Sequence, residues 1–493
     1  MAAEIVNRAV SRAWGKGEIV PDPKGNAPCP RAIGSLRLVA MKAFLLIASC
    51  MLTAGIIGPA AVASDYAIVV SEATRAEADW GKVIDALQHK HEGATVLSWK
   101  DSVAETKAAL VRQFPRHVCF VARPAEASEA MVRAVHKLTM EMDEDPYADV
   151  FWGILTGYDA ANALEIARET KPLVIRKVAS GTDVELDRCE EGRWYCELRQ
   201  GYTVHKEKGG EPTVEKGPAD TTAPLVEMLN DYQADLFVTS GHATERDWQI
   251  GFRYRNGSWQ SKAGQLFGID TKGHRTDVHS ANPKVYMPIG NCLMGHIDGP
   301  DAMALAFMKS AGVRQMFGYI VPTWYGYAGW GCLDYFVEQP GRYSLNEAFF
   351  ANHHALVHRL AEEKDANEVC GLTHDRDVVA FYGDPAWDAR LAEGKCSFKQ
   401  EFHLGKDGAA SLKITPLLGK ESFATVNTNG SQRGGRPIIQ FLEKRIDPTS
   451  VKITSGEDLH PVITDNFLLI PLPKTCDPDR IYEVAFSAKL IDG

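Results

Sequence analysis

The chain has 493 residues, of which 45% are hydrophobic and 24% charged, and its formal net charge is -10. This length exceeds what a single hydrophobic core usually supports, so we expect two to four structural units. The acidic balance excludes a nucleic-acid binder, which needs a basic surface to meet phosphates.

Residues 41–63 have the pattern of a secretory signal peptide. A lysine precedes the apolar run 43–57, and the small residues "AVA" end at Ala63. The run is shorter than the roughly 20 residues that a helix needs to span a bilayer, so we expect cleavage after Ala63 rather than a membrane anchor. The mature protein is then secreted, or kept in the periplasm or cell envelope, without a stable membrane span. Because signal peptides normally begin a chain, the start of translation is either Met1 or Met41.

Strand-like and helix-like segments alternate from residue 65 onward. Short apolar runs such as "DYAIVV" and "HVCFVA" are typical of buried strands, and apolar residues spaced three to four apart are typical of helices. This alternation predicts a parallel sheet between two layers of helices. The predicted strands are 65–70, 94–99, 117–122, one within 145–157, 234–240, 284–289 and 313–320. The predicted helices are 75–89, 103–113, 126–142, 158–170 (with Asp159 as its cap), 224–232, 301–311 and 344–364.

The alternation stops at "VVAFYGDPAW". From about residue 395 the segments are short, β-rich and separated by turns, as in "SLKITPLL", "SFATVNTNG", "PIIQFLEKR", "NFLLIPL" and "IYEVAFSAKL". Such a pattern is typical of a small β-sandwich. The predicted organisation is an extension with signal peptide (1–63), an N-terminal α/β subdomain (64–180), a catalytic α/β subdomain (181–394) and the β-sandwich (395–493).

Cysteine usage agrees with export. Eight of the ten cysteines follow the predicted cleavage site, and an exported protein meets an oxidising environment that permits disulfides. Cys189 and Cys196, in "CEEGRWYC", are spaced to close a short hairpin. A disulfide between them is the expected pairing, although sequence alone does not fix connectivity.

Two residues with catalytic chemistry directly follow predicted strands. The stretch "LFVTSGHATERDW" places His242 just after a strand, and "KVYMPIGNC" does the same for Cys292. The carboxyl ends of parallel strands meet at one edge of a sheet, where ligands and catalytic groups collect. A nearby imidazole raises the thiolate population of a cysteine or takes its proton, so the pair predicts thiol catalysis. Singly, His242 also fits a polar cap on a core strand, and Cys292 a small buried hydrophobe.

Four short motifs, in matching order, resemble those of the gingipain-type cysteine peptidases, within the caspase and legumain superfamily. They are "DPYADVFWGILTG", "SGHATERDW", "GNCLMGHIDGPDAMALAFMKSAGVRQMFGYIVPTW" and "FYGDPAW". The resemblance spans Asp65 to Gly493 and implies a secreted bacterial member. It implies a caspase-hemoglobinase-like, three-layer α/β core in two subdomains, followed by an immunoglobulin-like β-sandwich. It also implies a protein or peptide substrate, no required cofactor, and structural calcium.

Carried over by matching position, the resemblance makes Cys292 the nucleophile and His242 the general acid/base of a cysteine endopeptidase with a thioacyl-enzyme. The backbone N–H groups of Ala243 and Cys292 would form the oxyanion hole. A tryptophan after the following strand lines the specificity pocket in this family, which makes Trp324 and Trp330 the candidates here. The remaining candidates are Gly241, Glu245, Trp248, Gly290, Asn291 and Gly295 near the dyad, and Asp298 as an acidic residue for the pocket.

The sequence departs from the family pattern at two places. Ala243 replaces the glycine that follows the catalytic histidine, and Gly153-Ile154 stands where the family has Gly-Arg. These departures keep a second hypothesis open, namely a catalytically degenerate peptidase-fold protein that binds or scaffolds at the cell envelope.

A zinc-dependent hydrolase is the remaining alternative, because histidine and cysteine are the usual zinc ligands. The spacing of the candidate ligands matches no strong zinc pattern, and we predict no metal in the catalytic site. The candidates are His242, His274, His279, His296 and Cys292.

Overall fold

A computed structural model describes residues 65–491. The expected signal peptide and its cleavage site lie outside this range. No helix between residues 65 and 491 is both long and apolar enough to cross a membrane.

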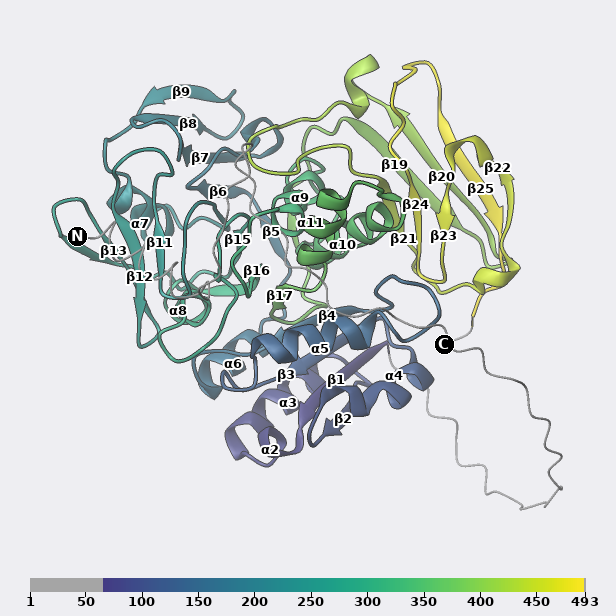
Figure 1. Ribbon diagram of the computed structural model, residues 1–493, viewed down its shortest axis with the longest axis horizontal. Coiled ribbons are helices and arrows are strands. Elements are labelled where there is room, and N and C mark those ends of the chain that lie inside the picture. Colours follow the sequence, from purple (N-terminus) through teal and green to yellow (C-terminus); the bar gives the residue numbers. More distant parts are fainter. Residues whose placement is uncertain (1–64, 492–493) are drawn as a thin grey trace.

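A twelve-stranded sheet forms the centre of the molecule (Figure 1). Most of its inner strands are apolar and rich in β-branched residues, and they are buried on both faces, as parallel strands between helix layers should be. The order of strands across the sheet is β2 (Thr95–Trp99), β1 (Tyr66–Ser71), β3 (His117–Val121), β4 (Phe151–Leu155), β17 (Val379–Tyr382), β16 (Val313–Tyr319), β15 (Lys284–Pro288), β10 (Leu236–Thr239), β6 (Lys177–Ser180), β7 (Glu191–Tyr195), β8 (Tyr202–Lys206) and β9 (Thr213–Lys216).

Ten strands of the sheet form two parallel halves that run in opposite directions, and β8 and β9 extend the second half as antiparallel strands beyond β7. Strands β2, β1, β3, β4 and β17 are parallel to one another, and so are β16, β15, β10, β6 and β7. The halves meet at the antiparallel pair β16–β17. The carboxyl ends of β10 and β15 therefore lie at one edge of the sheet, and those of β1, β3 and β4 lie at the other. The predicted boundaries at residues 180 and 394 stay predictions.

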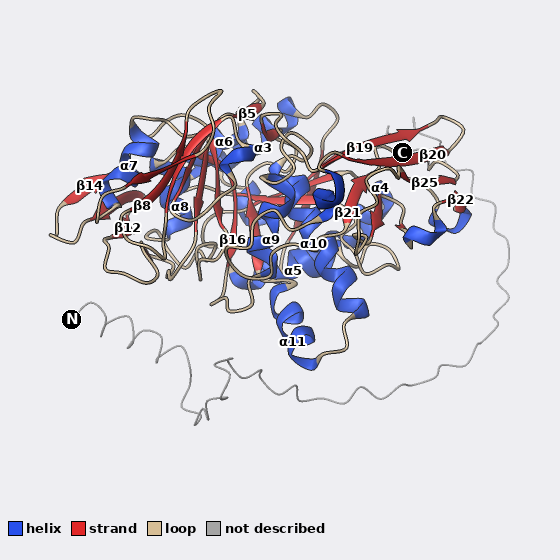
Figure 2. Cartoon of the chain, turned by 90° about the horizontal axis from the view of Figure 1, so that it is seen from above, coloured by secondary structure: helices blue, strands red, loops and turns tan. Residues whose placement is uncertain are grey.

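Helices cover both faces of the sheet (Figure 2). Figure 2 shows α3 (Ala78–Lys90) and α6 (Ala160–Ala167) on one side of the strands, and α5 (Glu129–Thr139) and α10 (Leu345–Glu362) on the other. Caps fix where several of them begin, and Asp159 accepts a hydrogen bond from the Asn162 N–H at the start of α6, as predicted. The other α-helices are α2 (Glu72–Arg75), α4 (Lys107–Gln113), α7 (Thr222–Asn230), α8 (Met303–Ser310), α9 (Tyr327–Phe336) and α11 (Ala366–Asp375). The predicted α/β class is confirmed.

Several elements were not predicted from the sequence. Helix α9, "YAGWGCLDYF", is buried on every side, so it lacks the apolar stripe that marks a surface helix. Strand β17 lies within "VVAFYGDPAW", the stretch at which the alternation was expected to stop. The long polar connection after β10 holds a four-stranded antiparallel sheet made of β11 (Asp247–Gln249), β12 (Ser258–Lys262), β13 (Gln265–Ile269) and β14 (Arg275–Asp277). Two further strands, β5 (Leu173–Ile175) and β18 (Ala389–Leu391), pair with each other.

Two small antiparallel sheets follow the core, and they agree with the predicted β-rich tail. One contains β19 (Phe398–Leu404), β20 (Ala409–Pro416), β25 (Tyr482–Ser487) and β22 (Lys452–Ser455); the other contains β21 (Ile438–Phe441), β24 (Phe467–Ile470) and β23 (Val462–Ile463). The segment "SFATVNTNG" is not a strand: a 3-10 helix covers Gly419–Phe423, and residues 424–437 contain no regular element. An immunoglobulin-like topology stays a prediction.

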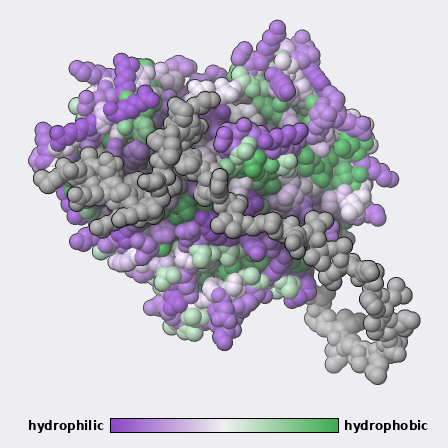
Figure 3. Space-filling view, viewed as in Figure 1, coloured by the Kyte–Doolittle hydropathy of each residue, from purple (hydrophilic) through white to green (hydrophobic). Residues whose placement is uncertain are grey.

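The smaller sheet lies between the larger tail sheet and the α/β core. Along β24, Leu468 and Ile470 pack into the core shared by the two tail sheets, whereas Phe467 and Leu469 pack into the main core. This alternation is the period of two expected of a strand that is buried on both faces. Hydrophobic residues also show on the surface over the C-terminal sheets, amid mostly hydrophilic neighbours (Figure 3). The tail is thus packed onto the core rather than appended to it.

The expected disulfide between Cys189 and Cys196 does not form, and both cysteines are free. Cys189 lies just before β7 and Cys196 just after it, so the five extended residues of β7 separate them by more than about 16 Å. A disulfide needs Cα atoms within about 7 Å. The hairpin is real, but its turn lies between β7 and β8, beyond Cys196.

A buried charged cluster fixes the loop after β17. The carboxylate of Asp384, which is 1% exposed, accepts hydrogen bonds from Tyr66 Oη at 2.7 Å and His91 Nε2 at 2.8 Å, and Lys90 Nζ lies at 2.9 Å. Burial alone would raise the pKa of Asp384, but the His91 hydrogen bond and the Lys90 charge hold it well below its usual range. The cluster ties the end of α3 to the "GDP" loop.

We expect Asp384→Asn to destabilise the protein by about 3 kcal/mol, because it leaves Lys90 without its counter-charge in a buried site. The wild-type contribution should be fully present above the unfolded-state pKa of about 4, and lost as the pH falls towards the folded-state value. Urea unfolding of the wild type and the variant at several pH values measures this difference in the free energy of unfolding. The control is Asp79→Asn, which breaks the exposed Asp79–Lys82 pair and should leave the midpoint unchanged. Equal effects of the two variants would contradict this account.

Candidate active site

The chain turns sharply after β10 and exposes His242. Gly241 has φ +97°, a conformation that side chains rarely adopt. The loop then folds back as a narrow antiparallel bridge, in which Gln249 N–H donates to His242 O at 2.9 Å. The exposed His242 ring stacks on Phe252, with ring centroids 4.9 Å apart. The imidazole therefore stands at the carboxyl end of β10, supported by one aromatic ring.

Cys292 lies in the turn that follows the neighbouring strand β15. Leu293, the next residue, has φ +57°, which is uncommon for a residue other than glycine. The half-buried sulfur accepts a hydrogen bond from the Thr323 N–H at 3.3 Å. Burial raises the pKa of the Cys292 thiol, and the Thr323 hydrogen bond offsets part of that rise. The resting residue is therefore a thiol at neutral pH.

Asn291 joins the two turns. It is fully buried; its Oδ1 accepts from Thr239 Oγ1 at 2.7 Å, and its Nδ2 donates to Gly241 O at 3.0 Å. Strands β10 and β15 are adjacent and parallel, with Thr239 opposite Pro288. One amide side chain, next to Cys292, thus bonds to the end of β10 and to the residue before His242. The structure brings the two predicted residues to the same edge of the sheet.

Two backbone donors near this edge have no hydrogen-bond acceptor on another of the described residues. In the Ala243–Trp248 bridge, the hydrogen bonds are made by the flanking residues, so the Ala243 N–H faces away from the bridge. Within residues 65–491, neither the Ala243 N–H nor the Cys292 N–H donates to a main-chain or side-chain acceptor of another residue. Such free N–H groups are what an oxyanion hole requires.

His242 and Cys292 do not form an ion pair in this structure. Among the described residues, no partner accepts from or donates to a His242 ring nitrogen, and the contacts of the sulfur are to Thr323. Catalytic hydrogen bonds are often long or absent before substrate binds. In this structure the imidazole lies at the same sheet edge as the thiol and makes no hydrogen bond to it.

The two acidic candidates share one neighbouring arginine. Arg246 forms an ion pair with Asp298 at 2.5 Å and another with Glu245. The backbone of Glu245 also accepts from the Met303 N–H at 2.7 Å, which anchors the loop to α8. A basic side chain of a substrate would therefore have to compete with Arg246 for Asp298.

Several near-site candidates have packing roles. Trp248 is fully buried, and its indole N–H donates to Ser240 O at 2.7 Å. Gly295 lies so close to β16 that a Cβ there would meet Gly318 O at 2.2 Å. Gly290 is covered by Trp330, whose Nε1 would lie 2.6 Å from a Cβ.

The two tryptophan candidates differ in exposure. Trp330, in α9, is 8% exposed, whereas Trp324 is 43% exposed. Trp324 directly follows Thr323, whose N–H contacts the Cys292 sulfur. Thr323 and Phe252 were not predicted, since no pattern in the sequence marks a backbone donor or a ring that supports a histidine.

The proposed zinc ligands do not converge within the described part of the chain. The one group of three or more potential ligands there is Asp143, Asp149 and Asp465, whose carboxylate oxygens lie within 4.8 Å of one another. All three are oxygen ligands, which suit calcium rather than zinc. An oxygen of the buried Asp465, Oδ1, has no hydrogen-bond partner, while Oδ2 pairs with Arg445.

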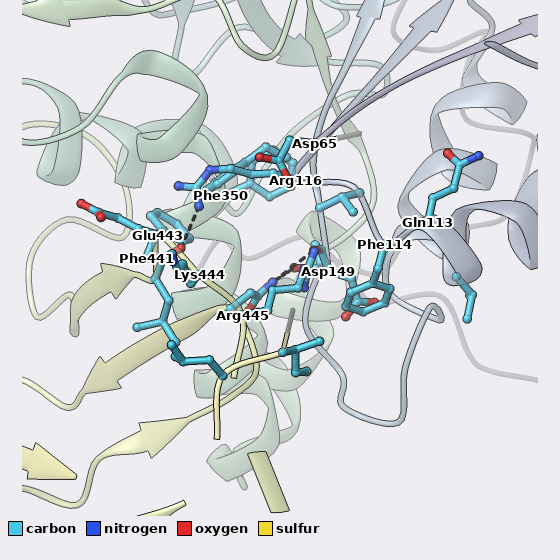
Figure 4. Close-up of a pocket in the computed structure, with 18 of the residues that line it drawn as sticks. Asp65, Gln113, Phe114, Arg116, Asp149, Phe350, Phe441, Glu443, Lys444 and Arg445 are labelled. Carbon is cyan, nitrogen blue, oxygen red and sulfur yellow. Dashed lines mark hydrogen bonds between the residues drawn. The ribbon is translucent and has the colours of Figure 1, made fainter. Parts of the chain in front are cut away.

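A cavity of about 710 Å³ lies between the core and the tail (Figure 4). Figure 4 shows Arg116, Phe114 and Arg445 around it. The Arg116 guanidinium donates to the carbonyl of Leu442 at 2.7 Å. Neither His242 nor Cys292 lines this cavity. Its size alone therefore does not make it the catalytic site.

No family model matches the sequence, and no curated protein matches it. Among solved structures, the chain is similar to gingipain R, described as an Arg-specific cysteine proteinase, with 10% identity and a TM-score of 0.41 over 88% of this chain and 98% of that one. It is also similar to a complex of the pro- and mature domains of a Porphyromonas gingivalis gingipain, with 9% identity and a TM-score of 0.39 over 86% and 99% of the chains. Both neighbours are gingipains, the family that the motifs resemble. Neither likeness assigns a role to a residue of this chain.

Because burial raises the pKa of Cys292, we expect its alkylation rate to keep rising with pH beyond the value of about 8.5 that is typical of a free thiol. Iodoacetamide labelling, followed at the Cys292 peptide by mass spectrometry, measures this profile. A plateau already reached below pH 7 would show a preformed thiolate and contradict the resting state described above.

Proposed function

We propose that the protein is a secreted cysteine endopeptidase in which Cys292 is the nucleophile and His242 the general acid/base. The observation that carries this proposal is the Asn291 side chain, which bonds to Thr239 and Gly241 and so holds the turns of both residues together. A cysteine and a histidine on adjacent parallel strands suit nucleophilic catalysis.

The proposed reaction uses groups of this chain alone. As substrate binds, the His242 ring leaves Phe252 and takes the proton of the Cys292 thiol, and the sulfur attacks the carbonyl carbon of the peptide bond. The N–H groups of Ala243 and Cys292 stabilise the oxyanion. His242 then gives its proton to the leaving amine, which leaves a thioacyl-enzyme. Water, deprotonated by His242, hydrolyses the thioester and restores the thiol.

We propose that the substrate side chain next to the cleaved bond is apolar and packs against Trp324. This tryptophan is the exposed member of the predicted pair and follows Thr323 directly. A basic side chain would have to compete with Arg246 for Asp298. An exposed aromatic surface favours apolar groups.

A structural calcium ion, which the resemblance implies, has suitable ligands in Asp143, Asp149 and Asp465. When bound, its two positive charges, together with Arg445, would balance three carboxylates that otherwise repel one another. Burial and the neighbouring acids raise the pKa of Asp149 to about 9, so without a cation this residue keeps its proton at neutral pH. The group links the loop after α5 to the tail, and it has no part in the reaction.

The alternative function is a peptidase-fold protein that binds partners at the cell envelope without cleaving them. The separation of His242 from any hydrogen-bond partner within residues 65–491 favours it. Activity measurements on matched cysteine variants distinguish the two functions.

We expect Cys292→Ala to lower kcat/KM on an unstructured protein substrate by at least about 1000-fold, because the nucleophile and its base act as a unit. His242→Ala should lose a similar factor. Cys476→Ala is the matched control, since this free cysteine is also partly exposed but lies in the tail. Hydrolysis that survives unchanged in Cys292→Ala would refute the peptidase proposal.

We expect Trp324→Ala to raise KM for peptides with an apolar side chain at the cleavage point by about tenfold, with a smaller change in kcat, because it removes ground-state packing. Leu417→Ala is the control: Leu417 is 53% exposed, in the tail. Peptide kinetics for both variants test this, and an unchanged KM in Trp324→Ala would rule out the assigned pocket.

A further inference from the structure

The tail sends an irregular segment back across the core. Residues 427–437, here called the bridging segment, run from the 3-10 helix after β20 to β21. In Figure 1 this yellow-green loop passes from the C-terminal sheets towards β7. There Asn429 Nδ2 donates to Thr182 Oγ1 at 3.2 Å and to Glu197 Oε1 at 3.1 Å. The segment therefore contacts the catalytic half of the sheet far from the tail's own core.

Buried ion pairs hold the bridging segment on α9. The Arg433 side chain is 3% exposed and donates to Asp334 Oδ1 and Glu338 Oε1, each at 2.5 Å. Gly434 N–H donates to Asp334 Oδ2 at 2.9 Å, and the Arg436 guanidinium lies 3.7 Å from the centroid of the Tyr327 ring. Removing one partner of such a buried pair leaves an uncompensated charge, so these contacts strongly favour one position of the segment.

The same segment presses on the tryptophan beside the catalytic turn. Gly430 has φ +99°, and a Cβ there would lie 2.2 Å from Trp330 Cε3. Trp330 also covers Gly290, which stands two residues before Cys292; a Cβ at Gly290 would lie 2.6 Å from the indole Nε1. The indole thus contacts both a glycine of the bridging segment and a glycine of the Cys292 turn.

We propose that Gly430 and Arg433 are positioning residues, through which the bridging segment holds Trp330 against Gly290 and fixes the turn that presents Cys292. The tail is then part of the catalytic apparatus rather than a separate adhesive module. The inference rests on the proposed role of Cys292, but its test measures the thiol and not peptide cleavage.

The test compares Gly430→Ala with Gly435→Ala. Both glycines have positive φ, so an alanine strains the backbone at either position, but a Cβ at Gly435 meets nothing within 4 Å. We expect Gly430→Ala to displace Trp330, free the turn and speed the alkylation of the half-buried Cys292 by about fivefold or more, while Gly435→Ala leaves the rate unchanged. Iodoacetamide labelling of the full chain, followed at the Cys292 peptide, gives the rates.

Two further variants keep the proposal testable if Gly430→Ala does not fold. Asn429→Ala removes only the side-chain hydrogen bonds to Thr182 and Glu197, and it should also raise the alkylation rate of Cys292. Arg433→Leu should do so as well, whereas Arg445→Leu, which breaks a tail ion pair beside the cavity of Figure 4, should lower stability without changing the rate.

Equal Cys292 alkylation rates in Gly430→Ala and Gly435→Ala, or in Arg433→Leu and Arg445→Leu, would overturn the positioning role. If the rates differ as expected while the wild type cleaves no peptide, the positioning role stands and the peptidase proposal falls. If the wild type cleaves peptides and the rates differ, kcat should fall more than KM rises in Gly430→Ala, because the nucleophile and not the substrate pocket has moved.

Discussion

The parallel pairing of β10 with β15 is the constraint on which the site depends. Parallel neighbours end at the same edge of a sheet, so any residues that follow these two strands must approach each other. Asn291 makes that approach specific, because its buried amide has one partner on β10 and another in the turn before His242. An unsatisfied amide at this depth would be costly, and the two turns are therefore held in one arrangement.

Charge is buried where distant parts of the chain meet. Asp384 joins the loop after β17 to the end of α3, and Arg433 joins the tail to α9. Each contact brings together residues far apart in the sequence, and each is nearly inaccessible to water. Buried charges contribute less to net stability than to the choice of one geometry, because any alternative leaves a charge without its partner. The tail and the core consequently behave as one unit around Cys292.

The main architecture was accessible from the sequence because it follows from local patterns. The strands before His242 and Cys292 are short apolar runs bounded by turns. The start of a helix can be recognised from its cap residue, as Asp159 shows for α6. Helix α9 was missed because it is buried on every side and so has no apolar stripe opposite a polar face. The antiparallel pairing of β16 with β17 was missed because no local sequence pattern specifies the direction of a strand. The Cys189–Cys196 disulfide failed because close spacing along an extended strand keeps two residues apart.

The sequence allowed residue types to be proposed for the site but not its contacts, and the catalytic roles of these residues stay predictions. His242 and Cys292 could be selected because their chemistry is recognisable at strand ends, whereas the Thr323 N–H, the Phe252 ring and the Gly430–Trp330 contact depend on tertiary structure alone. The central claim concerns how the imidazole engages the sulfur. A crystal structure of the protein after reaction with a peptidyl chloromethyl ketone measures this most directly. The account predicts inhibitor carbon bonded to Cys292 Sγ, with the His242 ring turned from Phe252 to within about 4 Å of that sulfur. An inhibitor bonded to Cys292 with His242 still stacked on Phe252 would contradict it.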